Sequence, residues 1–393
     1  MTDNLTVRPS VPGSLAPRAS SLRALAPDLS RGFMLLLIAI VHASVFRSAW
    51  SGSGFSASDP VDLAVSGLTT LLADDRGFAL FAVLFGYGVA QLYHRGTADG
   101  QEWPVLRVLL RRRGLWLVVI GLAHTVLLFF GDMLAVYGLI VLAFAGALRW
   151  AGRRLLAHAF AWLAGGTLVY AFGLPMIYQL LIGWNSVAPG EATVLSDLQY
   201  RLGWPLMMPL AFANAVFPFL IGVWAARRRV LDEPERNRKL LRAVAGYGVT
   251  ISVLAGLPYA LLSVGMWQAS PMTYTGVYWV NLMSSYAGGF GYAAVFALIA
   301  IRIGQRRGPV VGALVATGQR SMTCYLLQSV AWMVLSAPYL LGLQNSMSNI
   351  AAAGMGVGVW LVTVLMADAM ARRGIRGPAE TFYRRMTYGR TRA

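Results

Sequence analysis

The sequence is poor in charged residues, which make up only 12% of its 393 positions, while hydrophobic residues make up 57%. A soluble domain of this length typically has about 25% charged residues. This scarcity excludes a soluble globular protein and indicates a polytopic membrane protein.

Cysteine and acidic residues are also scarce. The single cysteine, Cys324, excludes an intrachain disulfide. There are 16 acidic residues against 33 lysines and arginines, which gives a formal net charge of +17. The basic residues form short blocks between apolar runs rather than one long patch, so we interpret them as topology signals and expect no nucleic acid partner.

Several common functional motifs are missing. There is no Walker-type loop, no G-x-G-x-x-G after a strand, no H-E-x-x-H and no Cys/His metal spacing. ATP hydrolysis, nicotinamide chemistry and zinc proteolysis are therefore unsupported, and we expect no metal. No cleavage site precedes the first apolar run, which we expect to remain as an anchor.

Ten apolar runs can cross a bilayer as helices, which need roughly 17 to 25 residues. The sequence predicts an all-α integral membrane protein, a bundle of about ten transmembrane helices. A short apolar run over 61–72 predicts an additional interfacial or re-entrant helix. The predicted spans are 32–50, 77–93, 113–131, 132–149, 154–183, 204–225, 240–266, 284–303, 319–341 and 349–371.

The basic residues alternate strongly between successive loops. With both termini cytoplasmic, 30 of the 33 fall on the cytoplasmic side, and only Arg47, Arg76 and Arg201 fall outside. This predicts a flexible cytoplasmic segment at 1–27, a membrane domain at 28–371 and a basic cytoplasmic tail at 372–393.

Polar side chains inside apolar runs are costly and are candidates for function. His42 lies ten residues after Gly32, about 15 Å into the bilayer at helical rise. His124, eleven residues after Arg113, is expected at a similar depth, and Tyr325 and Gln328 can face the same cavity. An imidazole there can act as a general base or acyl carrier; the alternative is a helix-to-helix hydrogen bond.

Polar groups at the ends of the spans are further candidates. Asp28 and Arg31 are three residues apart and can pair on one helix face. The pair can serve as a helix cap and positive-inside anchor, or as a gate or anion site at the cytoplasmic entrance. The stretch "FFGDMLAVYG" places Asp132 at an external turn, as a helix cap or an acceptor contact, with Tyr137 one turn later. Topology and the attraction of anionic lipids explain most of the basic cytoplasmic face, but some of its arginines can hold the phosphates of a nucleotide donor. The candidates are Arg31, Arg111, Arg112, Arg113, Arg227, Arg228 and Arg320.

Five stretches resemble the YeiB family of bacterial membrane proteins, which is defined by a domain of unknown function. They are "PDLSRGFMLLLIAIVHA", "RGFALFAVLFGYGVA", "RRRGLWLVVIGLAHTVLLFFGDMLAVYG", "GQRSMTCYLLQSV" and "RGPAETFYRRMTYG". The first is also similar to the opening of the acyltransferase-three family, whose superfamily includes the heparan glucosaminide N-acetyltransferases. YeiB-like sequences often carry Asn at the position of His42, which makes His124 the alternative base.

The resemblance implies transmembrane acyl transfer in the bacterial inner membrane, with His42 at the catalytic position. We expect acyl-CoA, with acetyl-CoA foremost, as the donor. The expected acceptor is a hydroxyl or amine of an extracytoplasmic glycan, lipid or metabolite. A proton-coupled transporter and a scaffold without chemistry are the rival functions. The lipid bilayer is the other expected partner, and a homo-oligomer is left open.

Overall fold

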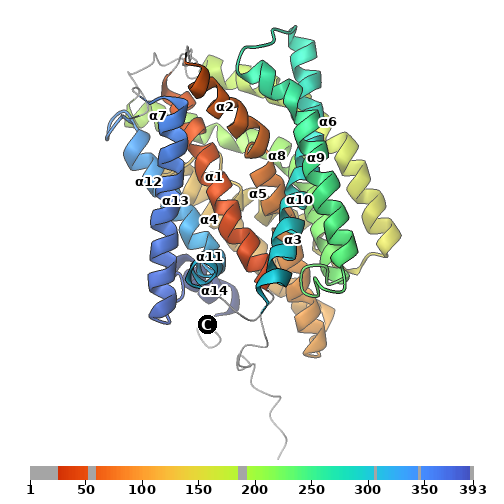
Figure 1. Ribbon diagram of the computed structural model, residues 1–393. Helices are drawn as coiled ribbons and strands as arrows, with labels where there is room; N and C mark the ends of the chain where they lie inside the picture. Colours follow the sequence, from red (N-terminus) through yellow and green to blue (C-terminus); the bar gives the residue numbers. More distant parts are fainter. Residues whose placement is uncertain (1–24, 52–58, 185–192, 305–307, 344–346, 390–393) are drawn as a thin grey trace, which may run out of the picture.

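The computed structural model describes residues 25–51, 59–184, 193–304, 308–343 and 347–389, and within these ranges every regular element is helical (Figure 1). The helices are α1 (Leu25–Ser51), α2 (Pro60–Leu72), α3 (Arg76–Ala98), α4 (Trp103–Leu127), α5 (Leu134–Phe144), the 3-10 helix η1 (Ala145–Arg149), α6 (Gly152–Trp184), α7 (Val194–Leu202), α8 (Trp204–Arg227), α9 (Arg238–Ser263), α10 (Pro271–Ile303), α11 (Pro309–Gln319), α12 (Ser321–Ser336), α13 (Asn349–Arg372) and α14 (Pro378–Tyr388).

Six helices are long and apolar enough to cross a membrane: α1, α6, α8, α9, α10 and α13. In α8, 78% of the most apolar window is buried inside the protein, against 17% in α6 and 22% in α9. Outward-facing apolar side chains need no protein cover where lipid surrounds them. The chain is therefore a multi-pass helical membrane protein with α8 in its interior and α6 and α9 on its outside.

The helices form one bundle in which neighbours along the chain and distant segments pack together (Figure 1). The pairs α9 with α10 and α4 with α5 are sequential neighbours, whereas α3 packs on α8 and α1 packs on both α11 and α13. Close approach of α3 and α8 depends on Gly86 and Gly222, where an added Cβ would meet backbone of the opposite helix. Small residues at such crossings let two backbones meet.

Several element boundaries differ from those predicted. Helix α1 begins at Leu25, inside the segment predicted as flexible up to residue 27, whose residues 1–24 lie outside the described residues. The run predicted at 319–341 is occupied by the shorter helix α12, which ends at Ser336. A further helix, α11, precedes it, and the two are separated at Arg320, which leaves helical geometry with φ −115° and ψ 30°. Part of the basic tail forms the packed helix α14.

The short helix α2 occupies the run predicted as interfacial or re-entrant. Its start follows from local chemistry, because the side chain of Asp59 accepts the amide of Val61 and Pro60 occupies the first turn. Figure 1 shows α2 and α7 at the end of the bundle opposite to α14. The turn between α2 and α3 thereby enters the interior and supplies residues of the cavity described next.

Candidate active site

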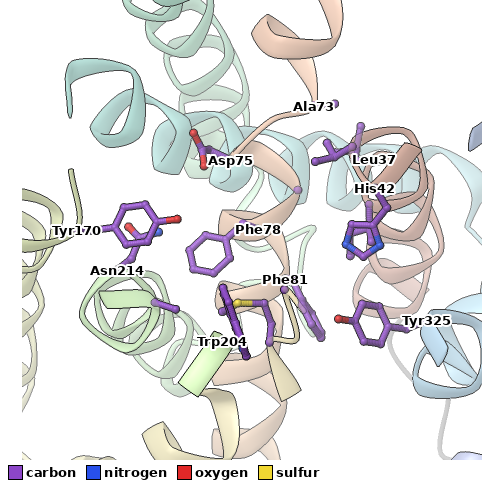
Figure 2. Close-up of a pocket in the computed structure, with 16 residues that line it drawn as sticks. Leu37, His42, Ala73, Asp75, Phe78, Phe81, Tyr170, Trp204, Asn214 and Tyr325 are labelled. Carbon is purple, nitrogen blue, oxygen red and sulfur yellow. The ribbon is translucent and has the colours of Figure 1, made fainter. Parts of the chain in front are cut away.

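A cavity of about 220 Å³ lies inside the bundle. Figure 2 shows Asp75, Tyr170 and Asn214 toward one end of it, and His42 and Tyr325 toward the other. Aromatic and aliphatic side chains fill the space between. The full lining is Leu37, Ile38, Val41, His42, Ala73, Asp75, Gly77, Phe78, Phe81, Gly131, Met133, Tyr170, Trp204, Ala211, Asn214 and Tyr325.

His124 forms a buried pair with Asp132. The distance from His124 Nδ1 to Asp132 Oδ1 is 2.8 Å, and the two residues are 3% and 0% exposed. An ionised carboxylate only accepts hydrogen bonds, so the proton lies on Nδ1 and the neutral imidazole presents Nε2 as a base. The pair therefore orients one nitrogen for proton transfer, as an orienting carboxylate does in hydrolytic triads.

Asp132 is held by two further hydrogen bonds. Its second oxygen, Oδ2, accepts the amide of Ala135 at 2.9 Å, and its backbone carbonyl accepts the indole N–H of Trp204 at 3.0 Å. Gly121 makes the approach of α4 to this turn feasible, since an added Cβ would meet Asp132 and Ala135. The turn predicted at the external surface thus carries a buried carboxylate that both caps α5 and orients an imidazole.

Tyr325 stands between the two imidazoles. Its ring centroid lies 5.2 Å from that of His124 and 6.1 Å from that of His42, and Phe129 packs 4.3 Å from His42. In Figure 2 the Tyr325 hydroxyl points toward the cavity. That hydroxyl lies near the backbone amide of Met133 but makes no hydrogen bond of normal geometry.

Three buried polar atoms at this place have no hydrogen-bond partner within the described residues: His42 Nδ1, His124 Nε2 and the Tyr325 hydroxyl. Each such atom costs about 1–3 kcal/mol if it stays unsatisfied. Three of them within one cluster indicate a place where a polar ligand binds. The structure thus brings together four of the side chains selected from sequence, namely His42, His124, Asp132 and Tyr325.

Of these four side chains, His42 and Tyr325 line the cavity, whereas His124 and Asp132 lie behind its wall. Two other selected side chains also lie near this cluster without lining the cavity. Gln328, one turn beyond Tyr325, donates to the carbonyl of Leu35 at 3.3 Å and to Thr363 Oγ1 at 3.4 Å. Tyr137 is fully buried, with Phe81 4.8 Å from its ring. Both side chains support the walls of the site from behind.

The predicted pair of Asp28 and Arg31 forms at the other end of α1. Their closest charged atoms are 3.5 Å apart, and Gln319 donates to Asp28 Oδ2 at 3.1 Å. Arg31 also donates to the carbonyl of Leu84 at 3.4 Å. This polar cluster ties α1 to α3 and α11 and keeps the Arg31 side chain 20% exposed.

The other six selected arginines divide into two groups. Arg227 donates to the carbonyls of Trp150 and Ala147, Arg320 to those of Ile375 and Ala316, and Arg113 to the Tyr388 hydroxyl. These three arginines brace the fold. The exposed arginines are Arg111, Arg112 and Arg228.

Sequence reasoning missed the opposite end of the cavity, where Asp75, Tyr170 and Asn214 lie. It also treated Arg76 as an external loop residue, whereas Arg76 is completely buried. The available signal was an isolated arginine directly after two aspartates at the start of an apolar run.

Within the described residues, no group of three His, Cys, Asp or Glu side chains is arranged to hold a metal ion.

Comparison with known proteins gives relatives of undefined activity. Residues 225–390 match the family described as "Protein of unknown function (DUF418)". The chain is 25% identical to the uncharacterized protein YxaH of Bacillus subtilis (strain 168), over 95% of this chain and 96% of YxaH. It is 25% identical to the uncharacterized protein YeiB of Escherichia coli (strain K12), over 92% of this chain and 95% of YeiB. These matches support a YeiB-like family.

The family match and the full-length relatives cover different parts of the site. The DUF418 region contains α9 to α14 and thus Tyr325, whereas His42, His124, Asp132 and Asp75 lie before it. The two bacterial relatives extend over almost the whole chain. The likeness to YxaH and YeiB therefore extends over almost the whole chain, and the site is built across both halves.

Proposed function

We propose that the protein is a membrane-embedded acyltransferase. It moves an acyl group, with acetyl as the first candidate, from cytoplasmic acyl-CoA to a hydroxyl or amine of an extracytoplasmic glycan, lipid or metabolite. The observation that carries this proposal is the Asp132–His124 pair, whose Nε2 has no partner and lies beside Tyr325 and His42 in a buried site. An oriented imidazole of this kind is the usual general base for acyl transfer.

The reaction follows from these positions. His124 Nε2 takes the proton of the acceptor as its oxygen or nitrogen attacks the thioester carbonyl carbon. Asp132 stabilises the resulting imidazolium. The carbon–sulfur bond of the tetrahedral intermediate then breaks, and the imidazolium returns its proton to the CoA thiolate. The Tyr325 hydroxyl is suited to donate to the oxyanion, where low polarity strengthens the interaction.

His42 has a secondary role in this proposal. Among the residues that the structure describes, its buried Nδ1 has no hydrogen-bond partner and no carboxylate bonds its ring, whereas Asp132 orients that of His124. We therefore assign the base to His124 and give His42, which lines the cavity, the task of binding the acceptor or relaying a proton. The family resemblance, which placed catalysis at His42 with His124 as the alternative, is compatible with this division.

The proposal includes a bacterial inner-membrane location, about ten membrane-crossing helices and cytoplasmic termini. The partition of basic residues supports this orientation. The exposed arginines of α4 and of the end of α8 suit the phosphates of the donor, with Arg31 at the entrance. A cavity of about 220 Å³ accommodates the reacting ends of the two substrates, which leaves the nucleotide at the cytoplasmic face.

A transporter is the second candidate, and one specific observation favours it. The helix broken at Arg320 places the start of α12 close to Tyr325, and transporters often bind substrates where a membrane helix is interrupted. Two buried imidazoles can also relay protons. This reading predicts proton movement coupled to substrate and no reaction with acyl-CoA.

The experiment that tests acyl transfer uses the purified full-length protein in nanodiscs with radiolabelled acetyl-CoA. We expect CoA release that His124→Ala lowers to background. The matched control is His158→Ala, because His158 is not part of the cluster of His124, Asp132 and Tyr325, and its Nδ1 donates to the carbonyl of Arg154 in its own helix. Absence of acetyl-CoA binding, together with proton uptake in proteoliposomes that depends on His124, would replace the enzyme with the transporter.

A further inference from the structure

The end of the cavity away from His42 contains a carboxylate that forms no ion pair within the described residues. Asp75 lines the cavity, and Asn281 Nδ2 donates a hydrogen bond to Asp75 Oδ2 at 3.2 Å. Asp75 is half-buried. A carboxylate that is withdrawn from water is stabilised when a positive group compensates it.

The neighbouring Arg76 forms no ion pair with Asp75 within the described residues, because other acceptors occupy its guanidinium. Arg76 Nε donates to Ser252 Oγ and Arg76 Nη2 to the Ser252 carbonyl, each at 3.0 Å. Nη1 donates to the carbonyls of Thr70 and Asp74 and, at 2.9 Å, to Asn281 Oδ1. The charge of Arg76 thus acts on Asp75 through space and across the Asn281 amide, while the cavity side of the carboxylate is left for a ligand.

The Asn281 amide fixes this arrangement. Arginine only donates hydrogen bonds, so the amide oxygen of Asn281 must face Arg76 and its NH₂ group must face Asp75. The backbone of Asp75 is also unusual, with φ 57° and ψ −27°, a left-handed conformation that is uncommon outside glycine. Strained backbone of this kind persists where the surroundings hold it and is frequent at binding sites.

Aromatic side chains lie at the same end of the cavity as the carboxylate. Tyr170 lines the cavity together with Asp75, and Figure 2 shows both toward this end. Phe78 adds a further ring, which Figure 2 shows between Asp75 and the centre of the cavity. A carboxylate among aromatic faces is the environment that organic cations prefer.

We propose that Asp75 binds the cationic amine of a bifunctional ligand whose other end reaches the His42 and Tyr325 end of the cavity. Phe78, Phe81 and Trp204 between the two ends require an apolar middle segment. Tyr325, only 4% exposed with its hydroxyl unpartnered, is the second polar group that points into the same space. The ligand class is thus an amino alcohol or diamine with an apolar spacer.

The identification of this ligand as the acyl acceptor rests on the proposed acyltransferase function, whereas its binding does not. The test therefore measures binding alone, by thermal unfolding of the full-length protein in detergent at pH 8. The probe is 6-aminohexan-1-ol, which has an ammonium group, a six-carbon spacer and a hydroxyl. The matched probe is hexane-1,6-diol, which replaces the ammonium by a second hydroxyl.

We expect 6-aminohexan-1-ol at ten times its Kd to raise the unfolding midpoint by about 2 °C, and hexane-1,6-diol to leave it unchanged. Asp75→Asn should weaken the binding at least about tenfold, and Asn tolerates the left-handed backbone. Asp74→Asn is the control, since Asp74 does not line the cavity. His124→Ala should retain the shift, which separates this inference from the reaction.

Three outcomes overturn the proposal. Equal shifts from the two probes would show that the ammonium is irrelevant. A shift of the same size from sodium chloride would assign the site to an inorganic cation. An unchanged affinity in a folded Asp75→Asn variant would place the amine elsewhere, and the probe comparison in the unmodified protein decides the question even where that variant does not fold.

Discussion

The substitution Asp132→Asn tests the central argument with a change of one atom. An asparagine has a single acceptor oxygen, whereas Asp132 accepts from both His124 and Ala135. If the NH₂ group faces His124, Nδ1 must become the acceptor and the proton moves to Nε2. His124 then presents a donor where the reaction needs a base.

The expected size of the effect follows from this change of tautomer. In hydrolytic triads the same substitution lowers turnover by about 10⁴-fold. Even a smaller loss, of about 10³-fold, would correspond to about 4 kcal/mol of transition-state stabilisation. The lost charged hydrogen bond should cost a further 1.5–3 kcal/mol, roughly, in the free energy of unfolding. Turnover should therefore fall far more than stability.

The assay is CoA release from acetyl-CoA, with kcat and KM measured separately and the thermal midpoint recorded for the same preparation. We expect kcat to fall to the level of His124→Ala while KM for acetyl-CoA stays within about threefold, because Asp132 does not touch the donor. The control is Asp368→Asn, because the Asp368 carboxylate forms a surface ion pair with Arg372 and lies outside the site. A folded Asp132→Asn protein that keeps a tenth of the wild-type kcat would refute the reasoning.

Three further changes probe the site and its supports. Tyr325→Phe should lower kcat by about 10–100-fold without lowering the thermal midpoint, because the lost hydroxyl has no partner; an unchanged kcat would remove Tyr325 from the reaction. Gly121→Ala should lower both midpoint and kcat, because its Cβ meets Asp132 and Ala135; an unchanged midpoint would contradict the close packing of α4 and α5. Glu380→Gln should loosen α14, since Glu380 accepts the amides of Met322 and Thr323 at the start of α12, with a cost of about 1 kcal/mol and faster proteolysis of the C-terminal helix. Equal proteolysis rates in the two proteins would show that α14 is held elsewhere.

The two histidines of the cluster were predicted from the depth at which each one lies in the membrane. Counting helical rise from the cytoplasmic boundary selected His42 and His124, and the structure places both rings within 6.1 Å of the Tyr325 ring. Hydropathy also indicated the helical membrane class, because a long apolar run has few alternatives to a membrane helix. The partner of His124 was missed because Asp132 precedes a helix, and sequence alone assigned it to an external turn as a cap or an acceptor contact.

The amino-acid sequence by itself determined the helical, multi-pass class and the candidate side chains, because apolar run length and buried polar groups are properties of local segments. It also carried the likeness to YxaH and YeiB. Only the tertiary structure decided which side chains meet. The pairing of His124 with Asp132 depends on how α4 and α5 pack, and the hydrogen bonds that engage the Arg76 guanidinium depend on Ser252 and Asn281 from α9 and α10. Arg76 and Asn281 are 205 positions apart in the sequence, so the packing of helices, rather than local composition, sets this contact.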